Sequence, residues 1–398
     1  MLTNIPDTDP WIGPFLENPG PRSMTVSWIR RDPAPCTLTV NTPDEPARSY
    51  ETTPCSRIGD DGDSVYRVRL DGLTPDRAYR YALRCPSGRV ESEFRTFPLD
   101  PERIVFIYYG DNKSIFDVHR RVATRFARHE PLFVMHSGDM TERGRYEEYR
   151  SYLFHPLRDV IDRIPLYPGR GNHEGNGQAF RELFDLPGSQ PWYAFDCGPV
   201  HGIVLDTTGW RHPPEHKDIP AMRAWLEADL ERPRPPWTIA MYHEPSYDLG
   251  WRKDDWGRED FLPILRRGGT DLTLSGHAHG YQRLHPMIAP GENDSNPITH
   301  IVSAGAGAPI GSKPLDPSPY LAVDARRFNY MVFTAERERL SVQVYSEYDA
   351  LLDEFELLKP NGQYPPEFIA RSMDQTAYPH GATRFTETAI GNQRCPNV

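Results

Sequence analysis

The chain has 398 residues and a formal net charge of −11 at pH 7, with 38% hydrophobic and 25% charged residues. This length is too great for one hydrophobic core, so we expect two or three domains of a globular protein. No apolar run reaches about eighteen residues, so we expect no transmembrane helix. The acidic balance without a cluster of Lys and Arg argues against a nucleic-acid surface.

The first residues, MLTNIPDTDPWIGPF, have neither the basic nor the apolar segment of a signal peptide. We therefore expect a cytoplasmic protein if the chain is full length, and a secreted protein if the chain is already processed. The five cysteines are scattered and form no CxxC pair, so no structural zinc site is expected. Their odd number argues against a disulfide framework but allows one bridge, and the oligomeric state stays open.

Residues 1–100 are predicted to form an all-β domain. Short runs rich in β-branched and aromatic residues, such as SMTVSWIRR, CTLTVNT and RAYRYALRC, are separated by turn signals. The segment GLTPDRAY, Gly72–Tyr79, looks like the corner before a late strand of a fibronectin type III sandwich. In that corner a tyrosine hydroxyl bonds to upstream backbone, and Tyr79 would fill this role.

Residues 101–357 change to apolar strands that alternate with helices, which predicts an α/β sandwich. IVFIYYGD, LFVMHSGD and IPLYPGRGNHE are typical of buried strands, and VHRRVATRFARH and YEEYRSYLFHPLRDVID are typical of the helices between them. HGIVLDT, WTIAMYHEP and DLTLSGH continue the strands, and THIVSAG, YMVFTAE and LSVQVYSE complete the sheets. Residues 358–398 form a polar, proline-rich tail that we expect to lie on the surface or to be partly mobile.

Polar side chains follow the predicted strands of this second domain, where each strand ends. They are Asp111, Asp139, Asn172, His173, His243, His277 and His279. Ligand sites in α/β sheets form outside the carboxyl ends of the strands, so we expect these side chains to converge. Oxygen and nitrogen ligands in this number suit two divalent or trivalent cations.

The order GD, GD, GNHE, H, GHxH resembles that of the calcineurin-like metallophosphoesterases. With the preceding sandwich, the chain looks most like the purple acid phosphatase branch. The resemblance implies a four-layer α-β-β-α sandwich and two metal ions, whose identity among Fe, Mn, Zn and Ni stays open. It implies that Asp139 bridges the ions, that Asp111 and His279 bind the first, and that Asn172, His243 and His277 bind the second. It also implies that a hydroxide between the ions attacks phosphorus.

The role of His173 has two interpretations. It either faces the substrate, as a phosphate donor or leaving-group acid, or orients Asp139. We also expect Tyr281 and Arg283, which follow the GHxH motif, to flank the pocket as substrate contacts, where Arg283 could pair with a carboxylate or with phosphate.

The chain departs from the family pattern at two positions. Lys113 stands two residues after the first Asp, where the family often has His or Gly, and could neutralise phosphate. His119 would then replace the missing ligand of the first ion or contact phosphate, or else be an ordinary residue of the first helical turn. Glu142 stands where the purple enzymes carry a ferric-ligand tyrosine, so no tyrosinate colour is expected.

The leading interpretation is a binuclear metal-dependent hydrolase of small phosphorylated substrates, most simply a phosphomonoesterase. One alternative is a phosphodiesterase that acts on nucleotides or lipids, since the ligand set is shared and only the loops around the cleft decide. The other is a non-catalytic fibronectin-type binding protein with a vestigial metal site. The survival of the six candidate ligands at the strand ends counts against this last reading.

Overall fold

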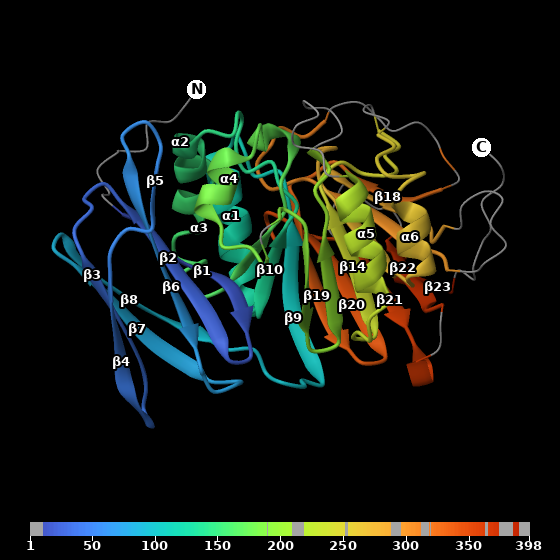
Figure 1. Ribbon diagram of the computed structural model, residues 1–398. Helices are drawn as coiled ribbons and strands as arrows, with labels where there is room; N and C mark the ends of the chain where they lie inside the picture. The colour runs from blue at the N-terminus through green and yellow to red at the C-terminus, as the bar shows by residue number, and fades with distance from the viewer. Residues whose placement is uncertain are drawn as a thin grey trace.

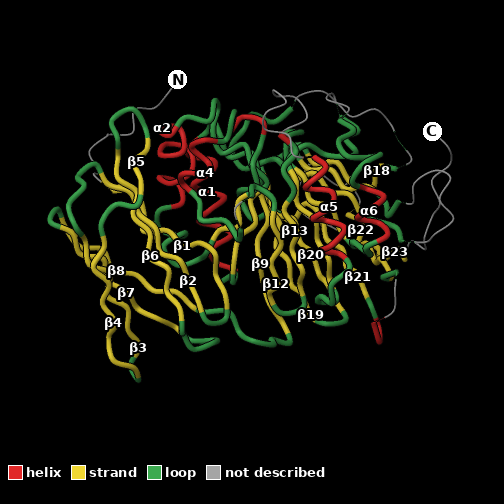
Figure 2. The backbone as a smooth tube through the Cα atoms, in the orientation of Figure 1, coloured by secondary structure: helices red, strands yellow, loops and turns green. Residues whose placement is uncertain are grey.

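The computed structural model describes residues 11–188, 190–208, 219–250, 254–287, 296–311, 318, 320–362, 365–373 and 385–389. Within these residues an N-terminal sandwich with the sheets β1-β2-β6-β5 and β4-β3-β7-β8 precedes a larger domain. The larger domain contains the sheets β11-β10-β9-β19-β20-β21-β22-β23 and β12-β13-β14-β15-β17-β16-β18. Figure 1 shows the sandwich in blue at one end of the molecule, and Figure 2 shows the strands in yellow.

The strands are β1 (Trp11–Gly20), β2 (Ser23–Arg30), β3 (Cys36–Thr42), β4 (Glu45–Thr52), β5 (Ser56–Ile58), β6 (Asp63–Asp71), β7 (Ala78–Cys85), β8 (Gly88–Arg95), β9 (Arg103–Tyr109), β10 (Phe133–His136), β11 (Leu166–Pro168), β12 (Tyr193–Cys197), β13 (Val200–Val204), β14 (Trp237–Tyr242), β15 (Leu272–Ser275), β16 (Tyr281–Leu284), β17 (Thr299–Ser303), β18 (Leu321–Ala325), β19 (Asn329–Glu336), β20 (Arg339–Ser346), β21 (Leu351–Leu358), β22 (Glu367–Met373) and β23 (Phe385–Ala389). The helices are α1 (Phe116–Phe126), α2 (Tyr146–Glu148), α3 (His155–Leu157), α4 (Gln178–Leu183), α5 (Ile219–Leu230) and α6 (Leu262–Arg267). Short 3-10 turns are η1 (Ala127–His129), η3 (Asn172–Glu174) and η6 (Pro360–Gly362), and η2 (Tyr149–Phe154) is a π-helix. No helix among these elements is both long and apolar enough to cross a membrane.

The N-terminal domain is a β-sandwich whose two sheets enclose a core that includes Trp28 and Tyr66. The Tyr79 hydroxyl accepts a hydrogen bond from the main-chain N–H of Thr74 at 2.9 Å, which confirms the predicted tyrosine corner. Cys36 and Cys85, on the paired strands β3 and β7, form a disulfide, a single bridge of the kind that the odd cysteine count does not exclude.

The larger domain is the predicted four-layer sandwich. Successive side chains of a strand point to opposite faces, so alternate residues of β14 pack against different layers. Trp237, Ile239 and Met241 enter the core between the two sheets, whereas Ala240 and Tyr242 face α5 and α6 in a second cluster. On the far side α1, α3 and α4 cover the eight-stranded sheet. The central strands β10, β14 and β15 are buried on both faces, which explains why they are near-continuous apolar runs.

A carboxylate between the two sheets joins them. Asp353 of β21 accepts hydrogen bonds from Arg283 of β16 at 2.6 and 3.1 Å and from the Tyr281 hydroxyl at 2.7 Å. The Arg283 guanidinium also lies 5.0 and 5.2 Å from the ring centres of Phe355 and Phe368. All three polar side chains are at most 1% exposed. The predicted substrate contacts of Tyr281 and Arg283 are wrong, because both polar ends turn into the core, and Arg283 takes the alternative partner, a carboxylate.

Part of the C-terminal tail continues the eight-stranded sheet. β22 pairs with β21, and β23 pairs with β22. Phe368 of β22 is buried in the core between the sheets. This strand therefore contributes to the same packing that holds Arg283.

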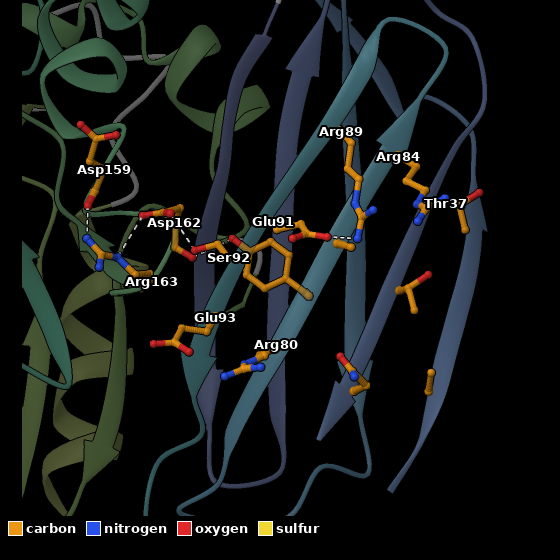
Figure 3. A pocket seen from close by; sticks show the side chains of 15 residues that line it. Thr37, Arg80, Arg84, Arg89, Glu91, Ser92, Glu93, Asp159, Asp162 and Arg163 are labelled. Atoms are coloured by element: carbon orange, nitrogen blue, oxygen red, sulfur yellow. Dashed lines mark hydrogen bonds and ion pairs between the residues drawn. The ribbon is translucent and has the colours of Figure 1, made fainter. Parts of the chain in front are cut away.

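The N-terminal sandwich contacts the helical layer through polar groups. The Tyr146 hydroxyl donates to Asp63 at 2.8 Å, and Thr25 donates to Asp185 at 2.8 Å. Ser92 of β8 donates to Asp162 at 2.7 Å, beside an open groove of about 1000 Å³ lined by charged side chains of both signs (Figure 3). Side chains of the sandwich thus engage the segments that follow Asp139 and Asn172 in the chain.

Replacing Asp353 by Ala should destabilise the protein strongly. The change leaves the Arg283 guanidinium buried without its anion, which costs about 3–5 kcal/mol in comparable cases. The measurement is the urea midpoint of the variant against the parent. Glu356→Ala on the same strand is the control, because Glu356 is partly exposed, accepts one hydrogen bond from Ser341 and lies 4.0 Å from Arg339, a distance at which an ion pair near the surface contributes at most about 1 kcal/mol. Equal midpoints for both variants would contradict the assignment of Asp353 as the link between the sheets.

Candidate metal centre

The six predicted metal ligands follow the carboxyl ends of neighbouring parallel strands. β10 pairs in parallel with β9 and β11, and β14 pairs in parallel with β15. Asp111, Asp139 and His277 adopt left-handed backbone angles, with φ of 58°, 57° and 68°. Such conformations cost about 1–3 kcal/mol each for non-glycine residues and persist where surrounding contacts impose them. The backbone is therefore strained at three of the positions that would carry ligands.

Glycines of the GD and GHxH motifs allow the segments that follow the strands to approach one another closely. A Cβ atom on Gly138, whose φ is +101°, would lie 2.3 Å from the main-chain nitrogen of Gly171. A Cβ atom on Gly276 would lie 2.5 Å from the Asp111 carboxylate. A side chain at either position would push the strand ends apart, so glycine is needed for the ligands to converge.

One group of acceptor atoms surrounds the Nε2 atom of His243. This atom lies 3.1 Å from the Asp139 carboxylate, 3.1 Å from the Asn172 side-chain oxygen and 3.2 Å from Nδ1 of His277. Nδ1 of His243 lies 3.0 Å from the carbonyl oxygen of Ser137, to which it can only donate. In the neutral imidazole Nε2 then presents a lone pair to other atoms that carry lone pairs. These atoms repel one another unless a cation lies between them.

The protonation of His243 also shows that the site needs positive charge. Burial by itself would lower the pKa of His243, but the adjacent Asp139 carboxylate outweighs burial and raises the pKa to about 9. Burial likewise opposes the charged form of Asp139, while His243, Lys113 and His173 hold the pKa of Asp139 well below its usual range. The site therefore keeps its carboxylate ionised and requires positive charge beside it.

A second group consists of Asp111, Asp139 and His279, whose ligand atoms lie within 4.8 Å of one another. Nδ1 of His279 lies 2.9 Å from the carbonyl oxygen of Pro309, so it carries the proton. Nε2 is buried without a hydrogen-bond partner, 3.5 Å from the Asp111 carboxylate. An orphaned buried lone pair beside two carboxylates fits a metal ligand. Because Asp139 belongs to both groups, it occupies the position between two possible ions.

Lys113 and His173 flank the Asp139 carboxylate. The Lys113 ammonium is buried and pairs with Asp139. His173 donates its main-chain N–H to Asp139 at 3.0 Å, and its Nδ1 lies 2.7 Å from the carbonyl oxygen of Glu142. Its Nε2 atom is 3.9 Å from Asp139, and the side chain is 29% exposed. His173 therefore turns one ring nitrogen toward the centre from a position that solvent reaches.

His119 is not brought to the centre, contrary to its prediction as a metal ligand or phosphate contact. Its Nδ1 lies 2.7 Å from the carbonyl oxygen of Tyr152 in the π-helix, and its Nε2 lies 3.1 Å from the Tyr109 hydroxyl. Both ring nitrogens are thus satisfied, and burial lowers the pKa of His119 to about 4, so the ring is neutral. The first turn of α1 faces the helical layer, and a strand-to-helix pattern cannot reveal which way that turn faces.

The structure adds Glu174 to the residues that shape the centre. Its buried carboxylate accepts the main-chain N–H groups of Gly171, Asp139, Met140 and Thr141 at 2.6, 2.8, 2.8 and 3.2 Å. It thereby ties the loop after β10 to the loop after β11. Burial and the neighbouring Asp139 raise the pKa of Glu174 to about 7. Glu174 is the last residue of the GNHE motif, and the sequence alone assigns it no role of its own.

Comparisons with known proteins agree with this geometry. Residues 106–281 match the family model of the calcineurin-like phosphoesterases. Acid phosphatase type 7 of Mus musculus is 27% identical over 370 residues, covering 79% of this chain and 82% of the mouse protein. Purple acid phosphatase 18 of Arabidopsis thaliana is 24% identical over 340 residues, covering 76% of this chain and 73% of the plant protein.

Solved structures show the same fold. The purple acid phosphatase PPD1 from yellow lupin superposes with a TM-score of 0.73 at 18% identity, covering 87% of this chain and 74% of the lupin chain. The structure of PhoD superposes with a TM-score of 0.67 at 14% identity, covering 87% of this chain and 89% of that chain.

Replacing Asp139 by Asn should abolish paired metal binding, because both groups lose their shared anionic oxygen. We expect chelated and re-metallated parent protein to bind two ions per chain, and the variant to bind at most one under the same conditions. Elemental analysis after gel filtration measures the content, and circular dichroism checks that the variant is folded. Asp117→Asn on the exposed side of α1 is the control. Two tightly bound ions in Asp139→Asn would refute the shared position.

Proposed function

We propose that the chain is a calcineurin-like metallophosphoesterase, and more narrowly a metal-dependent phosphomonoesterase acting on a small phosphorylated molecule. The observation that carries the proposal is the convergence of buried acceptor atoms on Asp139, with the orphaned Nε2 atom of His279 beside it. The names of the relatives, acid phosphatase and purple acid phosphatase, support the preference for monoesters.

The donor set divides between two ions. Asp111 and His279 would hold the first ion, Asn172, His243 and His277 would hold the second, and Asp139 would be shared. When bound, such ions polarise a phosphoryl oxygen and lower the pKa of a water molecule so that it can attack phosphorus near neutral pH. Fe, Mn, Zn and Ni all accept these nitrogen and oxygen ligands. Glu142 offers no phenol at the purple-enzyme position, and its carboxylate instead accepts a hydrogen bond from Ser114.

The chain's own residues supply proton transfer and charge. With Nδ1–H donating to the carbonyl oxygen of Glu142, the imidazolium form of His173 carries a second proton on Nε2, which it can give to the departing alkoxide or phenolate. The ring's partial exposure gives substrate access to it. Lys113 adds a buried positive charge beside Asp139, which favours a dianionic phosphate nearby. The buried surroundings keep water away from Asp111 and Asp139, so these interactions act in a medium of low dielectric constant.

The proposed activity is tested with matched aryl esters. We expect p-nitrophenyl phosphate to be hydrolysed with a higher kcat/KM than bis(p-nitrophenyl) phosphate, and we expect a chelator to remove both activities until metal is restored. Comparable or higher kcat/KM on the diester would favour the phosphodiesterase alternative. Metal binding without turnover of either ester would favour the non-catalytic alternative.

The role of the His173 ring is tested with His173→Asn, which keeps the main-chain N–H that Asp139 accepts. If the ring protonates the leaving group, kcat should fall by about 100-fold or more for phenyl phosphate, a typical loss for a general acid. It should fall much less for p-nitrophenyl phosphate, whose leaving group needs no proton. A loss of equal size on both esters would instead assign His173 to the orientation of Asp139.

A further inference from the structure

We propose that Asp254 is a positioning residue for His277, fixing the ring nitrogen that this histidine offers to the second metal ion. Asp254 lies outside the GD, GNHE and GHxH motifs, on the segment between β14 and α6. The inference rests on the proposed metal centre and adds a residue that acts on it through His277.

The geometry places the carboxylate on the far side of the ring. Nδ1 of His277 lies 3.2 Å from Nε2 of His243, within the acceptor group around Asp139. The opposite nitrogen, Nε2, lies 3.4 Å from the Asp254 carboxylate. The side chains of His277 and Asp254 are 1% and 2% exposed, so water does not compete for this contact. The ring thus spans from the centre to a buried anion.

This contact, at 3.4 Å, favours one tautomer of His277. A carboxylate can only accept, so Asp254 stabilises the form that carries its proton on Nε2. The Nδ1 atom then presents its lone pair to the centre, as a metal ligand must. Carboxylates that accept from the second nitrogen of a metal-binding histidine fix ring orientation and raise its basicity, and their loss typically weakens metal binding by about 10–100-fold.

Asp254 is itself held rigidly, as a positioning group must be. Two residues later, the Trp256 ring is buried between Tyr242 and Phe261, with ring centres 5.0 and 4.8 Å away. The main-chain N–H of Trp256 donates to the carbonyl oxygen of Pro245 at 3.2 Å. Arg258 donates to the carbonyl oxygen of Asp254 at 3.2 Å and to that of Ser246 at 2.6 Å. The segment therefore has little freedom to move its carboxylate away from His277.

The backbone of His277 is constrained as well. Its N–H donates to both oxygens of Asp111, at 3.0 and 3.2 Å, and its φ is +68°. Asp111 holds the backbone of His277, and Asp254 holds the far nitrogen of its ring. These two contacts together fix the position of Nδ1. Removing the carboxylate would release only the ring, so the effect should appear at the metal ion that His277 would bind.

The experiment is zinc binding to the full chain, followed by a competing chelator, for the parent and for Asp254→Asn. The variant has nearly the same size, and its amide can donate to Nε2, which favours the tautomer with the proton on Nδ1. We expect one of the two zinc ions to bind about 10–100-fold more weakly and the other to be little changed. The adjacent exposed residue provides the matched control, Asp255→Asn, which should bind both ions as the parent does.

A double-mutant cycle separates positioning from a general structural role. In a His277→Ala background, Asp254→Asn should cause no further loss of zinc affinity. Asp254→Ala, which removes the acceptor without adding a donor, should weaken the same ion, and the melting temperatures of the metal-free variants show whether each is folded. Parent-like affinity in a folded Asp254 variant, or a loss that persists without His277, would overturn the positioning role alone. A parent chain that binds no stoichiometric zinc would overturn the metal centre and this inference with it.

Discussion

Buried negative charge that the chain cannot neutralise alone is the constraint on which the catalytic domain depends. The carboxylates of Asp111 and Asp139 are fully buried, and the nearby Nε2 atom of His279 presents a lone pair rather than a proton. An isolated buried carboxylate is costly, so such a cluster persists only with compensating positive charge. Lys113 and a protonated His243 supply part of that charge, and two metal ions would supply the rest.

The loops that carry these groups are held by backbone contacts rather than by apolar packing. Glu174 gathers N–H groups from the turns after β10 and β11, and the close approach of Gly138 to Gly171 makes that sharing possible. Asn112 and His136 extend the arrangement, since His136 lies 2.7 Å from the Asn112 side-chain oxygen and accepts the N–H of Gly138 at 3.0 Å. The resulting rigidity maintains left-handed backbone angles that would otherwise relax.

The N-terminal sandwich is part of this support. Its contacts reach the helical segment after Asp139, through Tyr146 and Asp63, and the segment after α4, through Thr25 and Asp185. Its apolar residues Phe15 and Ile29 join the cluster that also contains α1 and the π-helix. The sandwich therefore stabilises the layer that backs the eight-stranded sheet, which is consistent with a packing role for a domain in which the sequence shows no catalytic cluster.

The sequence by itself determined the two kinds of domain, the four-layer architecture, the tyrosine corner at Tyr79 and the strand ends at which candidate ligands gather. The kinds of domain and the strand ends follow from local periodicity and from the geometry of parallel sheets, in which strand ends meet at one edge, whereas the four-layer architecture and the tyrosine corner come from resemblance to known families. Only the tertiary structure decided where side chains beyond those ends point. Tyr281 and Arg283 follow the GHxH motif directly, yet they turn inward because Asp353, seventy residues later in the chain, pairs with Arg283 between the sheets. His119 turns toward a carbonyl freed in a π-helix, and Asp254 approaches His277 from a loop without a motif. Such partners are distant in sequence, so no local pattern could have identified them.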